Sequence, residues 1–197
     1  MRLIKYLLWI IPLLGVMVIL GLMVSTSNAK DTDGRYHAGL PKSVSVRSNN
    51  FQNREDIPAE FSCYGVGGSP HIRWQRVPLA RSYALIVMDW DAPSPRLPLF
   101  PVVHWVVYNI PRTMMEIPEK VKKPDLDKLK VSVGLNVGGE AEFAPPCPPL
   151  GQHQYIFRVY ALDTDKLQPE TNDRDGVMKL MEGHILTYGE LVGVFGS

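Results

Sequence analysis

Residues 102–110 read VVHWVVYNI, and this stretch decides the fold because it is rich in β-branched and aromatic side chains. Its apolar residues fall on both alternating faces, which predicts a strand that is covered on each side. SYALIVM at residues 82–88 and YIFRVYAL at residues 155–162 have the same character and are bounded by Pro, Gly or Asp. The three stretches predict the central strands of stacked β-sheets.

The remaining sequence favours β structure with little helix. Seventeen prolines spread along the chain make long helices unfavourable. One short helix is expected from about Asp173 to Glu182, with Asn172 or Asp173 as its N-cap. A last strand is expected from Leu191 to Phe195.

Length and charge limit the classes of protein that the chain can belong to. The 197 residues, 45% of them hydrophobic, can form one domain with a good core. Lys and Arg number 21 against 20 Asp and Glu, and the one short basic cluster is at residues 120–123. Nucleic-acid binding depends on clustered basic residues, so nucleic acid is excluded as a partner.

The N-terminus has the features of a segment that enters a membrane. Arg2 and Lys5 precede an apolar run over residues 7–24, which is at the lower limit for a spanning helix and longer than most signal-peptide cores. Residues 1–29 are therefore predicted to be an anchor or a signal peptide. An anchor would give a single-pass protein with its domain on the extracytoplasmic side. Cleavage after Ala29 would instead release the domain to the periplasm or the exterior.

Residues 30–42, KDTDGRYHAGLPK, are polar and aperiodic, which predicts a linker before a domain at residues 43–197. Cys63 and Cys147 lie in that exported domain, where a disulfide can persist. If they are bridged, the loop-entropy model gives roughly 4 kcal/mol of stabilisation. Two buried free thiols are the alternative.

Two polar motifs lie at or within the predicted strands. MDWDAP at residues 88–93 places Asp89 and Asp91 two residues apart, so both carboxylates share one face if the backbone stays extended. The alternative is a pair of solvated acids at a strand end. His104 lies inside an apolar strand, where its ring costs free energy unless it has a partner. It is either a core histidine with a satisfied ring or part of a site.

The third motif is PPCPPLGQHQY at residues 145–155, a proline-rich run that leads His153 and Tyr155 into a strand. Prolines restrict the unfolded chain, so such a run presents side chains at low entropic cost. It is typical of a preformed pocket wall. A structural loop with an exposed histidine is the alternative.

These motifs, DWDAP at residues 89–93, HWVVYNIP at 104–111 and PPCPPLGQHQYIFRVYALD at 145–163, resemble the two signature regions of the phosphatidylethanolamine-binding protein family in order and spacing. IPAEFSCYGVGGSPHIRW at 57–74 and EGHILTYGELVGVF at 182–195 resemble its bacterial, Raf-kinase-inhibitor-like branch. The resemblance covers nearly the whole exported domain.

The resemblance implies an all-β fold, in which two antiparallel sheets pack as a β-sandwich with one or two short peripheral helices, here preceded by the hydrophobic N-terminal helix. It also implies a pocket for phosphate or a phosphorylated lipid headgroup, without a metal or cofactor. The residues that match the family's pocket motifs are Asp89, Asp91, Pro93, His104, Pro149, His153 and Tyr155.

The chemistry of these residues suits such a ligand. The histidines and Tyr155 can donate hydrogen bonds to phosphate, and a carboxylate can accept from an ammonium group or orient an imidazole. Because none of these pocket residues is Lys or Arg, we expect weak binding. The nearby carboxylates should favour the imidazolium, so anion binding should be stronger at mildly acidic pH.

The sequence also departs from the family pattern. Trp90 lies where proline is common, Tyr64 follows Cys63 where an acidic residue is common, and Gln154 replaces a frequent basic residue. Residues 143–145, FAP, replace a glycine-rich approach to the proline loop. Ligand choice and partner recognition are therefore expected to differ more than the fold.

A binding protein held close to the bilayer is the first functional hypothesis, and a regulator of an envelope or secreted protein is the second. An enzyme is not expected, because the chain has no G-x-S-x-G, H-E-x-x-H, P-loop or EF-hand motif. Two histidines and one carboxylate could still imitate a metal site, as His104, His153 and an aspartate would.

Overall fold

The computed structural model describes the backbone of residues 2–197 and the side chains of residues 12 and 14–197. The elements follow in the order α1 (Arg2–Ala38), β1 (Val46–Arg47), β2 (Glu55–Asp56), the 3-10 helix η1 (Ala59–Phe61), β3 (Ile72–Trp74), β4 (Ser82–Asp89), β5 (Pro93–Ser94), β6 (Leu97–Pro98), β7 (Val102–Pro111), β8 (Glu116–Ile117), α2 (Lys123–Lys128), β9 (Ser132–Gly134), β10 (His153–Leu162), α3 (Arg174–Met181) and β11 (Ile185–Phe195).

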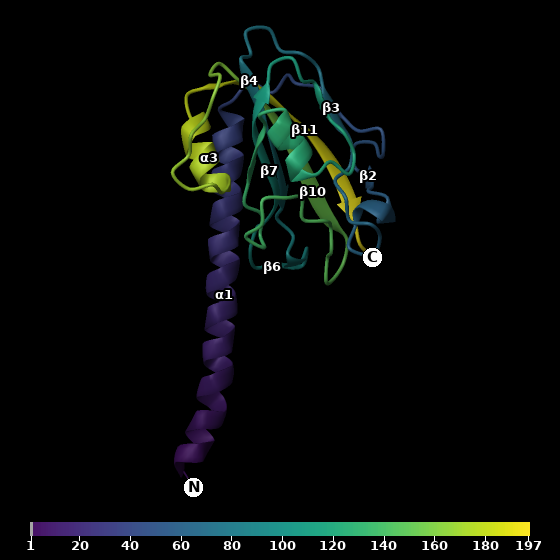
Figure 1. Cartoon of the computed structure of the whole chain (residues 1–197). Helices are drawn as coiled ribbons and strands as arrows, with labels where there is room; N and C mark the ends of the chain where they lie inside the picture. The colour runs from purple at the N-terminus through teal and green to yellow at the C-terminus, as the bar shows by residue number, and fades with distance from the viewer. Residues whose placement is uncertain (1) are drawn as a thin grey trace.

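A six-stranded sheet forms the centre of the domain, in the order β2-β11-β10-β4-β7-β9 (Figure 1). A three-stranded antiparallel sheet, β1-β3-β8, and the small β5-β6 hairpin complete the β structure. The prediction of a sheet-rich fold with few helices is confirmed. The prediction of two purely antiparallel sheets is wrong, because β2 pairs in parallel with β11 at the edge of the large sheet.

The central strands are covered on both faces, as their sequences predict. Strand β4 is buried along its whole length. On one face Leu85 and Trp105 share a hydrophobic cluster with Ile72 of the small sheet. On the other face Ile86 packs in a second cluster with Met181 of α3. A helix thus covers the second face, so the domain is not strictly a sandwich of sheets. An apolar strand needs cover on each side, but its sequence does not specify whether the cover is a sheet or a helix.

Helix α3 begins where the sequence predicts. The side chain of Asp173 accepts a hydrogen bond from the backbone N–H of Gly176 at 2.8 Å, which satisfies one of the free donors of the first turn. The helix ends at Met181, one residue before the predicted end.

The last strand is longer than predicted and begins at Ile185. It pairs with β10 over almost its whole length. A Cβ atom on Gly189 would lie 1.9 Å from the carbonyl oxygen of Val44, so glycine lets the segment before β1 cross this strand closely. Residues 187–190 interrupt the apolar pattern with polar and small side chains, so the apolar run alone predicts only the C-terminal part of this strand.

Helix α1 extends to Ala38, so residues 30–38 are helical and not the expected linker. Its buried face in this part is polar, since Thr26, Asp33 and His37 are all less than a tenth exposed. These three residues recur at helical spacing. A search for apolar periodicity misses such a face, because the residues are held by charge and hydrogen bonding.

The carboxylate of Asp33 joins α1 to the domain. Arg158 Nη1 of β10 donates to Asp33 Oδ2 at 2.5 Å, and Arg174 Nη2 of α3 donates to Asp33 Oδ1 at 2.7 Å. Arg158 Nε also donates to Glu190 Oε1 of β11 at 2.6 Å. One buried network therefore connects two helices and two strands.

His37 adds a second connection to β10. Its Nδ1 lies 2.6 Å from the backbone carbonyl oxygen of Asp33, and its Nε2 lies 2.8 Å from the Tyr160 hydroxyl. Burial lowers the pKa of His37, which favours the neutral ring. A neutral ring that donates from Nδ1 to the carbonyl accepts at Nε2 from Tyr160, so both ring nitrogens are satisfied.

Among the described residues, no helix has both the length and the apolar character that a membrane crossing needs. The predicted membrane segment, residues 7–24, includes residues 7–11 and 13, whose side chains lie outside the described part of the chain.

Cys63 and Cys147 are joined in a disulfide, with their Cα atoms 5.4 Å apart and a sequence separation of 84. The backbone N–H of Cys63 also donates to the carbonyl of Pro146 at 3.0 Å. The segment after η1 is thereby fixed to the proline-rich loop that precedes β10.

Asp33→Ala is expected to lower the free energy of unfolding by about 3 kcal/mol, because it leaves the buried Arg158 guanidinium with only Glu190 as a partner. Chemical denaturation of the full chain measures the change. Asp165→Ala is the control, because it breaks a surface pair with Arg81 and should cost at most about 1 kcal/mol. Equal losses in the two variants would contradict the role of the network.

Candidate functional site

The ends of three central strands meet at one edge of the large sheet. Strand β4 ends at Asp89, which is paired with Val102 at the start of β7 and with Tyr155 near the start of β10. A pocket of 250 Å³ lies at this edge. Its lining consists of Asp89, Ala92, Pro93, Phe100, Val102, His104, Val137, Ala144, Pro145, Cys147, Pro148, Pro149, His153 and Tyr155.

Asp89 organises the pocket through both of its carboxylate oxygens. Oδ1 accepts from the backbone N–H of Asp91 at 2.7 Å, and Oδ2 accepts from Nδ1 of His153 at 2.8 Å. The other ring nitrogen of His153 lies 3.3 Å from the carbonyl oxygen of Leu150. The His153 ring is therefore held between two oxygen acceptors and cannot turn without losing one.

His104 has one satisfied nitrogen and one free nitrogen. Its Nδ1 donates to the carbonyl oxygen of Ala144 at 2.7 Å. Its Nε2 is buried without a hydrogen-bond partner and lies 4.0 Å from Asp89 Oδ2. A buried polar atom without a partner is uncommon in native proteins, and here it lies in the wall of a pocket.

Burial lowers the pKa of His104, and the neighbouring His153 lowers it further. The carbonyl of Ala144 and the charge of Asp89 oppose this shift only in part. The expectation that carboxylates favour the imidazolium is therefore wrong for His104, because desolvation outweighs them. The ring is neutral at neutral pH, and its free Nε2 acts as an acceptor.

The ring of Tyr155 packs edge-on against the ring of His104 in the pocket. Its ring centroid lies 5.0 Å from that of His104 at an interplanar angle of 73°. Burial and the charges of Asp89 and Asp91 raise its pKa, so the hydroxyl keeps its proton and remains a donor.

Asp91 does not line the pocket, although the family motif implies that it should. Its Oδ2 accepts from the backbone N–H of Gln154 at 2.9 Å, and its Oδ1 lies 3.9 Å from Lys30 Nζ of α1. The strand ends at Asp89, so the rule that residues two apart share a face no longer applies at Asp91. Asp91 supports the start of β10 and faces the helix.

The other predicted pocket residues, Pro93 and Pro149, do line the cavity. The sequence analysis missed the apolar side chains of Phe100 and Val137 in the wall. It also missed the carbonyl groups that orient the two histidines, for which a single sequence holds no signal. The unusual Trp90 is only 4% exposed and packs in the core cluster beside α3.

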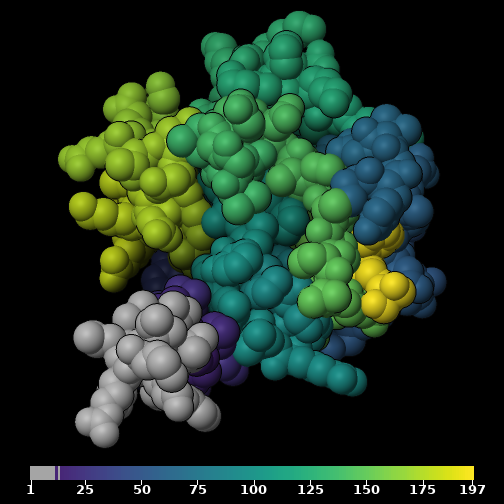
Figure 2. Space-filling model, turned by 90° about the horizontal axis from the view of Figure 1, so that it is seen from below, coloured from purple at the N-terminus to yellow at the C-terminus, as the bar shows by residue number. Residues whose placement is uncertain are grey.

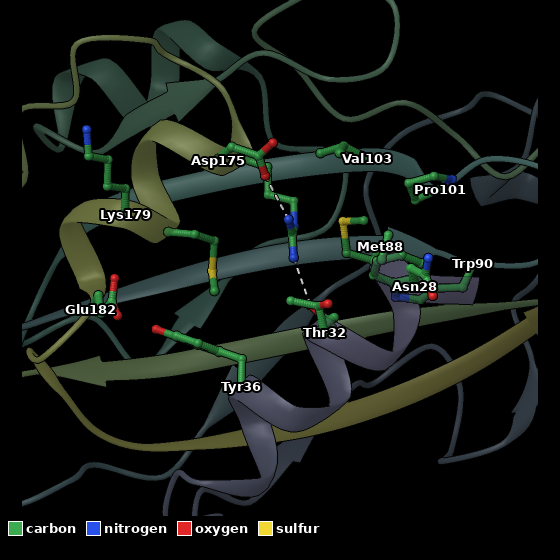
Figure 3. A pocket seen from close by; sticks show the side chains of 14 residues that line it. Asn28, Thr32, Tyr36, Met88, Trp90, Pro101, Val103, Asp175, Lys179 and Glu182 are labelled. Carbon is green, nitrogen blue, oxygen red and sulfur yellow. Dashed lines mark hydrogen bonds and ion pairs between the residues drawn. The ribbon is translucent and has the colours of Figure 1, made fainter. Parts of the chain in front are cut away.

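A larger hollow of 620 Å³ lies between α1, α3 and the ends of β4 and β7 (Figure 3). Thr32 and Tyr36 enter it from α1, Lys179 enters it from α3, and Glu182 follows directly after α3. Arg174, which also lines it, already pairs with Asp33 and Asp175. Its Nε is buried without a partner, as is Nε2 of His104. The smaller pocket is the better candidate site, because it brings together the motif residues Asp89, His104, His153 and Tyr155.

Within the described residues, no group of three or more His, Cys, Asp or Glu side chains is arranged to hold a metal ion. In particular, Nδ1 of His153 already donates to Asp89.

Comparison with known proteins gives a consistent result. The sequence model described as phosphatidylethanolamine-binding protein matches residues 47–196. The UPF0098 protein of Methanothermobacter thermautotrophicus is 38% identical over 156 residues, which cover 77% of this chain and 98% of the relative. The UPF0098 protein of Pyrococcus abyssi is 40% identical over 154 residues, which cover 75% of this chain and 83% of the relative.

Two crystal structures have the same fold. CT736 of Chlamydia trachomatis, a homologue of phosphatidylethanolamine-binding protein, superposes with a TM-score of 0.70 at 32% identity. That match covers 79% of this chain and 99% of CT736. YbcL of E. coli, a member of the same family, gives 0.68 at 30% identity and covers 78% of this chain and 98% of YbcL.

His104 should titrate below the ordinary histidine value of about 6.5, because its ring is buried. Asp89→Asn should lower the pKa of His104 further, because it removes a charge that favours the protonated ring. NMR of the imidazole resonances as a function of pH measures both values. An upward shift in Asp89→Asn would contradict the assigned cause.

Proposed function

Because the chain belongs to the phosphatidylethanolamine-binding protein family, we propose that its pocket binds a small phosphorylated group such as phosphoethanolamine. The observation that carries the proposal is the buried Nε2 of His104, which has no partner within the described chain. A ligand atom at this position would satisfy it.

The neutral state of His104 determines how phosphate would be held. A bare Nε2 accepts a hydrogen bond, so a phosphate monoanion can bind through its own P–OH group. A phosphate dianion offers no donor, so it can bind only after the ring takes up a proton. In both cases the ring and the ligand share one proton, and the Tyr155 hydroxyl is a neutral donor close by.

The pocket suits weak and selective binding. Its volume of 250 Å³ accommodates a headgroup but not a whole lipid. Among the described residues that line it, none is Lys or Arg, so no full positive charge is built in for the phosphate. Asp89 lies 4.0 Å from the free Nε2 and would repel a dianion unless a proton or an ammonium group lies between them.

We propose a binding protein and not an enzyme. The sulfur of Cys147, which lines the pocket, is bonded to Cys63 and cannot serve as a nucleophile. His153 has both nitrogens engaged, which suits a fixed wall better than a proton carrier.

The proposal includes a location at the extracytoplasmic surface of a membrane, with residues 7–24 as the anchor. The apolar sequence of this run and the positive residues before it support the anchor. The disulfide between Cys63 and Cys147 supports an oxidising compartment, since such bonds are rare in the cytosol.

Calorimetric titration of the full chain in a phosphate-free, uncharged detergent tests the ligand. Phosphoethanolamine should bind saturably at pH 6, and His104→Ala or His153→Ala should weaken its affinity at least about tenfold, or about 1.4 kcal/mol. His184→Ala is the matched control, because this half-exposed histidine pairs with Asp163 outside the pocket and should leave the affinity unchanged. Equal effects in all three variants would refute the site.

The affinity for phosphoethanolamine should fall as pH rises from 6 to 8. Phosphate loses its second proton near pH 6, and the lowered pKa of His104 keeps the ring from supplying a proton above that value. Titration at pH 8 in two buffers of different ionisation enthalpy should show uptake of about one proton. A flat affinity with no proton uptake would contradict the shared-proton arrangement.

A further inference from the structure

Helix α1 leaves the domain at the same edge that contains the pocket. Figure 1 shows α1 projecting past the end of the sheet near β6, which belongs to the connection from β4 to β7 at the pocket edge. Thr26 is the first fully buried side chain of α1, and residues 14–22 are exposed. The apolar run therefore ends within one turn of the point where the domain begins.

The connection between the apolar run and the domain is stiff. Helix α1 is continuous from Arg2 to Ala38, and Asp33 and His37 fix its C-terminal part to β10. The eighteen residues of the run are about 27 Å long as a helix, which is close to the ~30 Å hydrocarbon core of a bilayer. If a bilayer surrounds this run, the pocket edge lies at the bilayer surface. The docked helix would then restrict rotation of the domain relative to the membrane.

The pocket edge carries exposed apolar side chains, which we call the apolar rim: Leu97, Phe100, Val137 and Leu150. They are 37%, 46%, 60% and 64% exposed, respectively. Phe100 and Val137 line the pocket itself, and Leu150 follows the two prolines of its wall. Figure 2 views the molecule from below, where α1 projects, and shows the segment near residues 90–102 next to α1 and the segment near residues 145–152 beyond it.

We propose that the apolar rim rests on the surface of the bilayer that holds α1, so that the pocket opens directly toward lipid headgroups. The inference rests on the proposed function and names the source of the ligand as the membrane. A lipid phosphodiester has no P–OH group, so its ammonium group would be the donor to the free Nε2 of His104. The partner is a lipid surface because α1, docked on the domain through Asp33 and His37, carries the apolar run past the edge of the sheet that bears the rim. The exposed Arg96, in the turn between β5 and β6, adds a cation that suits phosphate groups.

Fluorescence quenching in vesicles of phosphatidylcholine and phosphatidylethanolamine tests this orientation. The full chain carries an environment-sensitive dye on Leu97→Cys or Leu150→Cys, and the lipids carry a quencher at headgroup depth. Leu79→Cys is the control, since Leu79 is 85% exposed in the turn before β4, at the other end of the sheet. Quenching at positions 97 and 150 should be several-fold stronger than at 79, and equal quenching at all three would overturn the proposal.

A flexible Gly-Ser-Gly-Ser insertion between Ser25 and Thr26 tests the stiff connection. Quenching at positions 97 and 150 should then fall toward the level at 79, and unchanged quenching would show that α1 does not set the orientation. Protein that does not float with the vesicles would refute the anchor and with it this proposal.

Calorimetry with free phosphoethanolamine separates the two proposals. Binding in solution without rim quenching contradicts only the orientation at the membrane. Rim quenching without binding supports the orientation and contradicts the proposed ligand.

Discussion

The buried positive charge of Arg158 is the constraint on which the arrangement of the molecule depends. Its side chain projects from β10 toward the helical face of the sheet and is 7% exposed. Removing such a charge from water costs several kcal/mol unless anions surround it. Glu190 comes from the neighbouring strand, and Asp33 can come only from α1, so α1 must dock on the sheet. The direction of the N-terminal helix follows from this one electrostatic requirement.

Strand β10 links this docking site to the pocket. His153 and Tyr155 lie at its first residues and form the pocket wall, and Arg158 and Tyr160 project a few residues later toward the helices. Strand residues are about 3.3 Å apart, so the pocket and the helix contacts lie within about 25 Å on one continuous element. The position of the pocket relative to the docked part of α1 is therefore set by this strand.

The sequence predicts the parts of the molecule whose cause is local. The central strands follow from apolar runs that need cover on both faces, and the cap of α3 follows from Asp173. The docked part of α1 cannot be predicted in this way, because Asp33 pairs with Arg158 and Arg174, which lie more than a hundred residues away in sequence. Likewise, the sequence shows that His104 needs a partner, but the carbonyl of Ala144 cannot be identified without the fold. The family motif places Asp91 in the pocket, but the strand ends at Asp89, and Asp91 instead accepts from the backbone N–H of Gln154.

The pocket has no built-in cation, and in the proposed orientation α1 directs the pocket toward a bilayer. These two features complement each other. With one free imidazole nitrogen and a neutral tyrosine, the proposed site would hold phosphate too weakly to extract a scarce ligand from solution. At a bilayer, however, headgroups are present at very high local concentration, and a tether raises occupancy without any new contact. Weak binding also allows each headgroup to leave quickly, because the rate of release largely sets affinity among related sites. The proposed anchor and rim would thus give a weak site high occupancy with rapid exchange, which a tight soluble carrier cannot combine.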